Sequence, residues 1–279
     1  MNLFLQHGVP PLPQNFTVYH RIASECFGLR ETDGMSLWKD LRTFLFQLVQ
    51  AIKVSDVPDN SAIEKFDQLL LIAHYYATRA ACRQISALQN IAAKISIALL
   101  RYTDIIPCDK GFYEAGMDLR QQGRESEAFV MLNHYLDVCE AIEEGSGDLV
   151  DHTDLSSTDF PSSVPIPEFM HLRHEVKLHE EVRDWILAIS MDQKVDQTLP
   201  TDDRNLYESS LGIGDAACLI SGYPVLGRQP ITFQRSSLLA NRDIWSKLTV
   251  AAKMSPHTDA PDVIEFLEQW QGPANYINN

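Results

Sequence analysis

The chain has 279 residues and carries 38 acidic against 23 basic side chains, a formal net charge of −15 at pH 7. This balance argues against a nucleic-acid partner, which would require a basic face to displace counterions from phosphates. Hydrophobic residues make up 45% of the sequence, an ordinary value for one or two folded domains, and no apolar run approaches the ~20 residues of a membrane-spanning helix, so membrane insertion is not expected.

The first 142 residues are predicted to form stacked helical hairpins. Residues 36–54 repeat apolar side chains every three or four positions, which indicates an amphipathic helix with Ser36 as its N-cap. Residues 62–102 keep the helical period without Pro or Gly for about forty positions, longer than one helix of a globular protein usually runs. We therefore expect two antiparallel helices that separate between Thr78 and Arg83.

Residues 109–142 are predicted to form a helix–turn–helix of the length of one tetratricopeptide repeat, roughly 34 residues. The aromatic, small, large apolar and turn positions of that repeat are occupied by Phe112, Gly116, Leu119, Gly123, Ala128 and Leu132. Tyr135 and Glu140 depart from it, where Ala and Pro are usual. The sequence thus predicts a mainly α fold whose segment 1–142 is an α-solenoid of tetratricopeptide-like hairpins.

The next two segments connect these hairpins to the end of the chain. Residues 143–178 are acidic, rich in Ser and Thr and interrupted by Pro, which indicates a linker or a strap lying over the helices. Residues 179–213 are predicted to be bridging helices. Within them, residues 179–192 show a helical apolar face, and residues 202–212 have room for a short further helix.

No pattern predicts a catalytic residue, a metal site or a cofactor. The cluster of His171, His174, Glu175 and His179 lacks the H-E-x-x-H spacing, so we interpret it as the polar start of a helix. Gly212 and Gly214 form a G-x-G without a preceding strand. Five basic residues near the end are interpreted as a soluble surface, with an acidic docking partner as the alternative: Arg228, Arg235, Arg242, Lys247 and Lys253.

The cysteines also argue against zinc. Cys26, Cys82, Cys108, Cys139 and Cys218 are scattered, and no two have the short spacing of a zinc knuckle. Such an odd, dispersed set is typical of a reducing compartment, so an intracellular, cytoplasmic protein is expected. Cys218 opens a C-x-x-S frame in which the second thiol of a knuckle is replaced by Ser221.

That frame resembles the opening of the U-box, the zinc-free relative of the RING domain. The string CLIS at 218–221 is similar to the family's C-P-I-S, TFQR at 232–235 to its strand, SPHT at 255–258 to its second loop, and 263–270 to its last helix. The resemblance implies a small α+β domain without zinc over residues 214–279. Two departures are a longer first loop at 222–227 and a short span at 257–262, where a strand of the family is expected to be lost.

The resemblance also implies roles for single residues. Cys218 becomes a buried small hydrophobe, while Ser221 and Ser255 offer hydroxyl partners in place of zinc-binding thiolates. A U-box supplies no nucleophile and instead docks a ubiquitin-conjugating enzyme. The candidate contact residues for that enzyme or for ubiquitin are Ile220, Pro256, Leu219 and Tyr223.

Long strings throughout the chain resemble the C-terminal region of the largest subunit of intraflagellar transport complex B. They are LLLIAHYYATRAA at 69–81, DKGFYEAG at 109–116, EEVRDWILAISMDQ at 180–193 and CLISGYPVL at 218–226. This resemblance implies a scaffold that acts in the cilium or flagellum, takes part in cargo transport and tip turnaround, and binds other intraflagellar transport subunits. Ubiquitin ligation, or ubiquitin binding without transfer, by the final module remain as alternatives.

Overall fold

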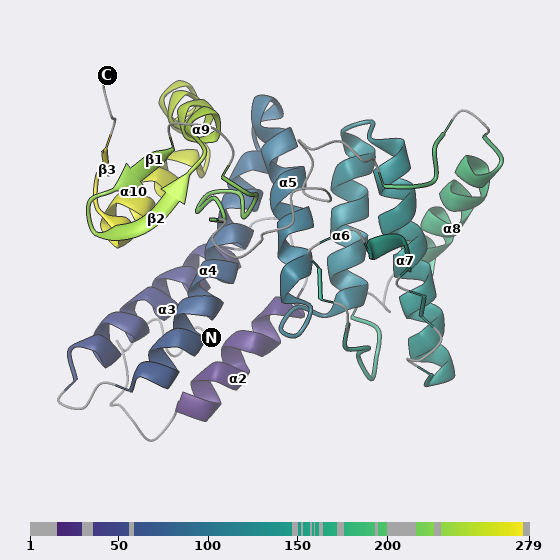
Figure 1. The fold of residues 1–279 in the computed structure, drawn as a ribbon, viewed down its shortest axis with the longest axis horizontal. Coiled ribbons are helices and arrows are strands. Elements are labelled where there is room, and N and C mark those ends of the chain that lie inside the picture. The colour runs from purple at the N-terminus through teal and green to yellow at the C-terminus, as the bar shows by residue number, and fades with distance from the viewer. Residues whose placement is uncertain are drawn as a thin grey trace. The chain divides into compact units, whose positions relative to one another are not determined.

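The described parts of the chain are mainly α-helical, as the sequence predicts (Figure 1). The computed structural model describes residues 16–29, 36–55, 59–146, 150–151, 153–156, 158, 160–161, 164–171, 176–192, 195–199, 216–225 and 230–275. The chain divides into two compact units, Met1–Thr78 and Arg79–Asn279. None of the helices in these described ranges is both long and apolar enough to cross a membrane.

The first unit is built from α2 (Phe16–Phe27), α3 (Leu37–Lys53) and most of α4 (Asn60–Arg83). Its core contains a stack of aromatic rings in which the Trp38 and Tyr76 centroids lie 4.2 Å apart, with Phe27 against both. The amphipathic helix predicted over 36–54 is confirmed as α3. Ser36 occupies the N-cap position, but its hydroxyl donates to the Asp40 carboxylate at 2.7 Å instead of capping a backbone N–H.

The predicted break in the long helical segment is confirmed, although it lies at the end of the expected window. Helix α4 runs through Arg83, and the chain then passes through η1 (Ser86–Leu88) into α5 (Gln89–Leu99) and η2 (Leu100–Tyr102). Arg79 and Arg83 lie one turn apart on α4. Both form ion pairs with carboxylates of α6 (Cys108–Gln121). These two ion pairs stabilise the last turn of α4.

The helix–turn–helix predicted over 109–142 is confirmed as α6 (Cys108–Gln121) and α7 (Glu125–Glu144). Gly123, at φ +68°, makes the turn between them. The two helices approach so closely that a Cβ placed on Gly116 would lie 2.5 Å from Leu132 Cγ. Tyr135, where the repeat pattern has Ala, is buried, and its hydroxyl lies 3.4 Å from His179 Nδ1.

The acidic stretch after α7 packs on the helices in its described parts, which favours a strap over a free linker. Its apolar side chains are buried in the core shared with α6 and α7: Val150, Leu155, Phe160 and Val164. Cys108 Sγ donates to the carbonyl of Pro165 at 3.3 Å, and the His171 amide donates to Asp109 Oδ2 at 2.7 Å. A short 3₁₀ helix, η4 (Thr153–Leu155), lies within this strap.

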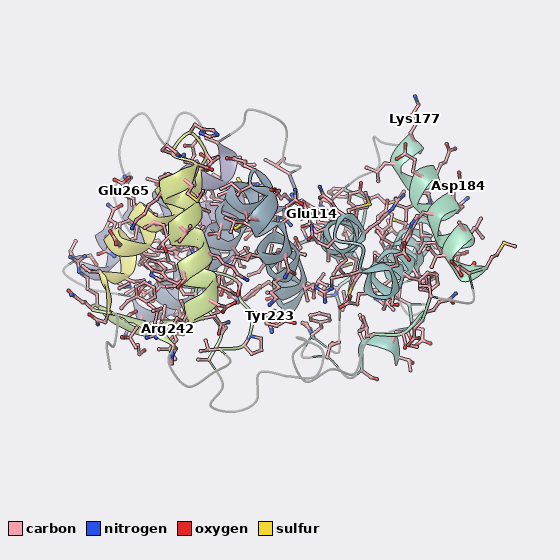
Figure 2. All side chains as sticks on the ribbon, turned by 90° about the horizontal axis from the view of Figure 1, so that it is seen from above. Glu114, Lys177, Asp184, Tyr223, Arg242 and Glu265 are labelled. Carbon is pink, nitrogen blue, oxygen red and sulfur yellow. The ribbon has the colours of Figure 1, made fainter. Side chains whose placement is uncertain are left out.

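Helix α8 (Val176–Ser190) follows the strap and confirms the helix predicted from residue 179 onward. Val182 and Ile186 join the core beside α7, while Lys177 and Asp184 point outward (Figure 2). The short helix suggested for 202–212 lies outside the described residues. Arg120 lies over the Trp185 ring with its guanidinium carbon 5.0 Å from the ring centroid, which fastens α8 to α6.

The last part of the chain is an α+β module, here called the C-terminal module, made of residues 216–225 and 230–275. Strands β1 (Ile231–Phe233), β2 (Ser236–Ala240) and β3 (Ala274–Asn275) form an antiparallel sheet in the order β2-β1-β3. Helices α9 (Arg242–Met254) and α10 (Ala260–Gln271) complete it, with Trp245 of α9 packed edge-on against Phe233. Residues 255–259 join α9 to α10 without an intervening strand.

Candidate interaction site

The first loop of the C-terminal module, residues 218–224, closes on itself through backbone hydrogen bonds. The Cys218 amide donates to the Tyr223 carbonyl, and the Gly222 amide donates back to the Cys218 carbonyl, both at 2.7 Å. Gly222 adopts φ +68°, a left-handed conformation that glycine tolerates without strain. The Leu219 amide donates to the Leu239 carbonyl at 2.8 Å, which ties the loop to β2.

Side chains also hold the same loop. Cys218 Sγ accepts the Asn241 amide at 3.3 Å, and Asn241 Nδ2 donates to the Pro224 carbonyl at 3.1 Å. Ser221 is fully buried, and its hydroxyl oxygen accepts the Tyr223 amide at 3.3 Å. In the parts of the chain that the structure describes, no three His, Cys, Asp or Glu side chains gather as metal ligands.

The four candidate contact residues fall into two groups. Leu219, Ile220 and Tyr223 on the first loop are buried, at 2%, 0% and 2% exposed, and their role in docking a partner stays a prediction. Pro256, on the second loop (residues 255–259), is exposed. Ser255 stabilises that loop through its carbonyl, which accepts from the Thr258 amide at 3.1 Å and from the Thr258 hydroxyl at 2.7 Å.

The helices before the strap contact the first loop directly. Tyr223 belongs to the apolar core that contains Ile97 of α5 and Leu100 of η2. Lys94 Nζ lies 4.8 Å from the centroid of the Tyr223 ring, and Arg101 Nη1 donates to the Gly222 carbonyl at 2.8 Å. Burial lowers the pKa of Lys94, and the carboxylate of Asp243 on α9 opposes that shift only in part.

A second attachment joins the turn after α4 to the start of α10. Gln84 Nε2 donates to Asp259 Oδ2 at 2.6 Å, and the Asp259 amide donates to Gln84 Oε1 at 2.9 Å. The reciprocal pair fixes the side-chain amide in one orientation. The C-terminal module is therefore fastened to the helices at both of its loops.

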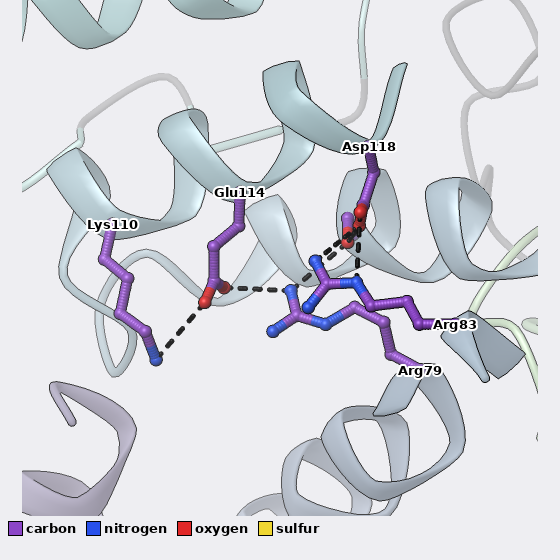
Figure 3. A network of polar contacts seen from close by, with 6 residues as sticks. Arg79, Arg83, Lys110, Glu114 and Asp118 are labelled. Carbon is purple, nitrogen blue, oxygen red and sulfur yellow. Dashed lines mark hydrogen bonds and ion pairs between the residues drawn. The ribbon is translucent and has the colours of Figure 1, made fainter. Parts of the chain in front are cut away.

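A separate network of charges lies among α4, α5 and α6 (Figure 3). Arg79 binds Glu114 at 2.8 Å, and Lys110 Nζ lies 3.8 Å from the other oxygen of Glu114. Arg83 makes a two-pronged contact with Asp118 at 3.0 and 2.8 Å. Burial alone raises the pKa of Glu114, but Arg79 and Lys110 outweigh it and lower the pKa to about 2. Every charge here is engaged with another, which indicates a structural role.

The remaining residues considered from sequence are described only in part. His171 Nδ1 lies 3.3 Å from Asp109 Oδ1, His179 contacts Tyr135, and the other two members of the His cluster, His174 and Glu175, lie outside the described residues. Gly212 and Gly214 lie outside them as well. Of the five basic residues, Arg235 donates to the Gln269 carbonyl and Lys247 pairs with Asp243 within the module.

Comparison with known proteins identifies the family, although no family model matches the chain. An intraflagellar transport protein 172 homolog of Drosophila melanogaster is 61% identical over 280 residues, which covers 99% of this chain. The chain corresponds to the C-terminal region of the intraflagellar transport protein 172 family. The Homo sapiens homolog is 43% identical over 278 residues, and the Chlamydomonas reinhardtii protein is 32% identical over 274 residues.

The family relation reaches across the whole chain but not across the whole relative. The match covers 97% of this chain for the human homolog and 92% for the algal protein. The chain itself spans only 16% of the length of the Drosophila and human relatives. The names of these relatives place them in intraflagellar transport.

The contacts of the helices with the two loops were not predicted from the sequence, because the helices and the last module were treated separately. Arg101 and Gly222 are 121 positions apart, and Gln84 and Asp259 are 175 apart. No local period or motif connects such positions. The one available signal was the apolar character of the loop, because Leu219, Ile220 and Tyr223 together are more hydrophobic than an exposed loop needs to be.

Proposed function

We propose that this chain is a protein-interaction segment of an intraflagellar transport subunit, acting in the cytoplasm and the cilium or flagellum as part of complex B. The observation that carries the proposal is similarity along 92–99% of the chain to proteins named for intraflagellar transport. Its partners are other intraflagellar transport subunits, and its work is to hold cargo-carrying particles together, including at tip turnaround. The chain needs no catalytic residue or cofactor for this role.

Within this proposal, residues 1–142 act as a solenoid of tetratricopeptide-like hairpins and residues 214–279 as a U-box-like recognition module. The close α6–α7 approach at Gly116 supports the first assignment, because repeat hairpins require a small residue there. The self-closed loop at Cys218, the three-stranded sheet and the two helices support the second. Residues 143–178 act as the strap between them, followed by the bridging segment 179–213.

A full-length intraflagellar transport subunit carrying this chain tests the scaffold role. We expect that deleting residues 216–279 in ciliated cells reduces co-precipitation of at least one other subunit and alters the return of particles from the ciliary tip. Imaging of tagged particles measures the second effect. Val54→Ala, at a position 81% exposed on the first unit, is the control and should leave both unchanged. Unchanged co-precipitation of the other subunits, together with normal return of particles from the ciliary tip, would contradict the proposal.

A second candidate function for the module is ubiquitin transfer or ubiquitin binding. The specific observations in its favour are a first loop held by Cys218, Ser221 and Asn241, and a second loop whose Pro256 is exposed. In that role the module docks a ubiquitin-conjugating enzyme and contributes no nucleophile. Purified chain mixed with activating enzyme, conjugating enzyme and ubiquitin should modify itself, and Ile220→Ala should abolish the signal. Equal modification of both proteins excludes the ligase.

A further inference from the structure

We propose that α5, the turn before it and η2 hold the C-terminal module in a closed position, in equilibrium with a released one, and that the closed position covers Tyr223 and Gly222 of the first loop. The proposal rests on the second candidate function only for the class of partner, a ubiquitin-conjugating enzyme. The covering contact itself stands on the geometry of Tyr223, Lys94, Arg101 and Gln84.

The closed contact has an aromatic anchor. Tyr223, labelled in Figure 2, lies on the module, is 2% exposed and belongs to the apolar core that also contains Ile97 and Leu100. A buried tyrosine ring removes a large apolar area from water, and Lys94 adds an attraction to its face. The anchor therefore contributes apolar burial to this contact.

Polar contacts accompany the anchor. They include the Arg101–Gly222 hydrogen bond and the reciprocal pair between Gln84 and Asp259. Gln84 is exposed, so its bonds compete with water. A hydrogen bond of this kind changes an equilibrium by roughly two- to tenfold. Such a contact holds two parts together without locking them permanently.

The first loop does not depend on the helices for its own shape. Its internal bonds join Cys218 to Tyr223 and Leu219 to Leu239, and Asn241 clips both ends of the loop. All of these partners belong to the module. Release of the module can thus expose the loop in its folded form.

The closed position covers one of the two loops of the proposed docking surface. Tyr223 on the first loop lies in the core shared with the helices, whereas Pro256 on the second loop is exposed. An enzyme that needs both loops would meet only one of them. Its apparent affinity is then reduced in proportion to the fraction of released module.

The test uses the 279-residue chain with Gln84→Ala, Lys94→Ala and Arg101→Ala combined. All three residues lie on the helical side, so the module keeps its own bonds. Three losses of about twofold each should raise the released-to-closed ratio on the order of tenfold. Hydroxyl-radical footprinting of Tyr223, read by mass spectrometry, measures that ratio without any partner. Asn90→Ala, at an exposed position of α5, is the control and should leave Tyr223 protected.

The expected result is a tenfold rise in Tyr223 oxidation with unchanged helical circular dichroism. Unchanged oxidation in a folded triple variant overturns the closed contact. If the triple variant does not fold, Gln84→Ala alone should still raise Tyr223 oxidation about two- to threefold. Unchanged oxidation of that single variant would also overturn the closed contact.

Titration with a ubiquitin-conjugating enzyme then separates this inference from the ubiquitin-linked function. If the triple variant binds the enzyme more tightly by the factor seen in footprinting, and Ile220→Ala abolishes that binding, both the closed contact and the ubiquitin-linked function are supported. Increased Tyr223 oxidation without any enzyme binding keeps the closed contact and removes the ubiquitin-linked function.

Discussion

Glu114 receives two buried cations at the point where the end of α4 meets α6. Arg79 and Lys110 are each 1% exposed, so neither cation is compensated by bulk water. Ser96 of α5 connects the two halves of the network, accepting from Arg79 at 3.2 Å and donating to Asp118. One carboxylate thus balances charge contributed by two helices, and its removal affects more than a single ion pair.

We predict that Glu114→Gln lowers the free energy of unfolding by about 3 kcal/mol at pH 7, because it withdraws the anion beside two buried cations. Urea unfolding monitored by circular dichroism measures the loss. Glu64→Gln, at an exposed position of α4, is the matched control and should change stability by less than about 0.5 kcal/mol. A loss as small as that of the control would contradict the structural role of the network.

The same variant predicts a dependence on pH. The pKa of Glu114 is lowered from 4.5 to about 2, so its stabilisation is complete above pH 4.5 and is lost as the pH falls toward 2. Glutamine has no proton to gain in that window. The difference in unfolding free energy between wild type and Glu114→Gln should therefore shrink between pH 4.5 and pH 2. A constant difference across repeated urea titrations would show that Glu114 acts without its charge.

At the scale of elements, the α6–α7 pair depends on a missing side chain. A Cβ added to Gly116 would lie 2.5 and 2.6 Å from two carbons of Leu132, well inside van der Waals contact. The helix loses backbone entropy by carrying glycine in its middle, and the close packing of α7 offsets that cost. Gly111 of the same helix has more room, since its nearest side-chain atom is Leu100 Cδ2 at 3.3 Å.

We expect Gly116→Ala to reduce the free energy of unfolding by about 1–3 kcal/mol, because α6 and α7 must separate to admit the methyl group. Gly111→Ala is the control, because it gains the same helix propensity and meets only the flexible end of Leu100. Thermal unfolding of both variants measures the difference. Equal unfolding midpoints for the two variants would mean that the α6–α7 interface can accommodate an added methyl group beside Leu132.

The elements with a strong local period could be predicted from sequence, and the contacts between distant segments could not. The period of 36–54 predicted α3, and the spacing from Phe112 to Leu132 predicted the α6–α7 pair. The break after Arg83 came at the edge of its window because ion pairs, which no period records, extend α4. The packing of the strap and the burial of Tyr223 depend on partners far along the chain.

The candidate site shows the same division. Side chains that work within the first loop, such as Ser221, were identified from the C-x-x-S frame, because their partners are a few residues away. The burial of Tyr223 was not predictable, since it depends on the apolar core that the module shares with the helices of its unit. The local sequence pattern therefore identified the loop, and tertiary packing determines which of its side chains are exposed.

At the scale of the whole molecule, hydrogen bonds and apolar packing hold the module's loops, with thiols serving as ordinary core groups. All five cysteines are buried thiols that form no disulfide. Burial raises the pKa of Cys82, Cys108 and Cys139 to about 12, which keeps these thiols protonated at neutral pH. A protonated thiol is a poor metal ligand, so zinc binding at these positions would have to overcome both burial and protonation.

We predict that a chelator leaves the thermal unfolding of the chain unchanged, and that purified protein contains far less than one zinc per molecule. Asn241→Ala should instead destabilise the chain by about 1–3 kcal/mol, because it removes the donor to the Pro224 carbonyl inside a buried loop. Asn90→Ala on α5, which is exposed, is the control for the loss of an amide. A lower midpoint in chelator, together with stoichiometric zinc, would show that an ion holds the loops and that the hydrogen bonds of Asn241 and Ser221 are secondary.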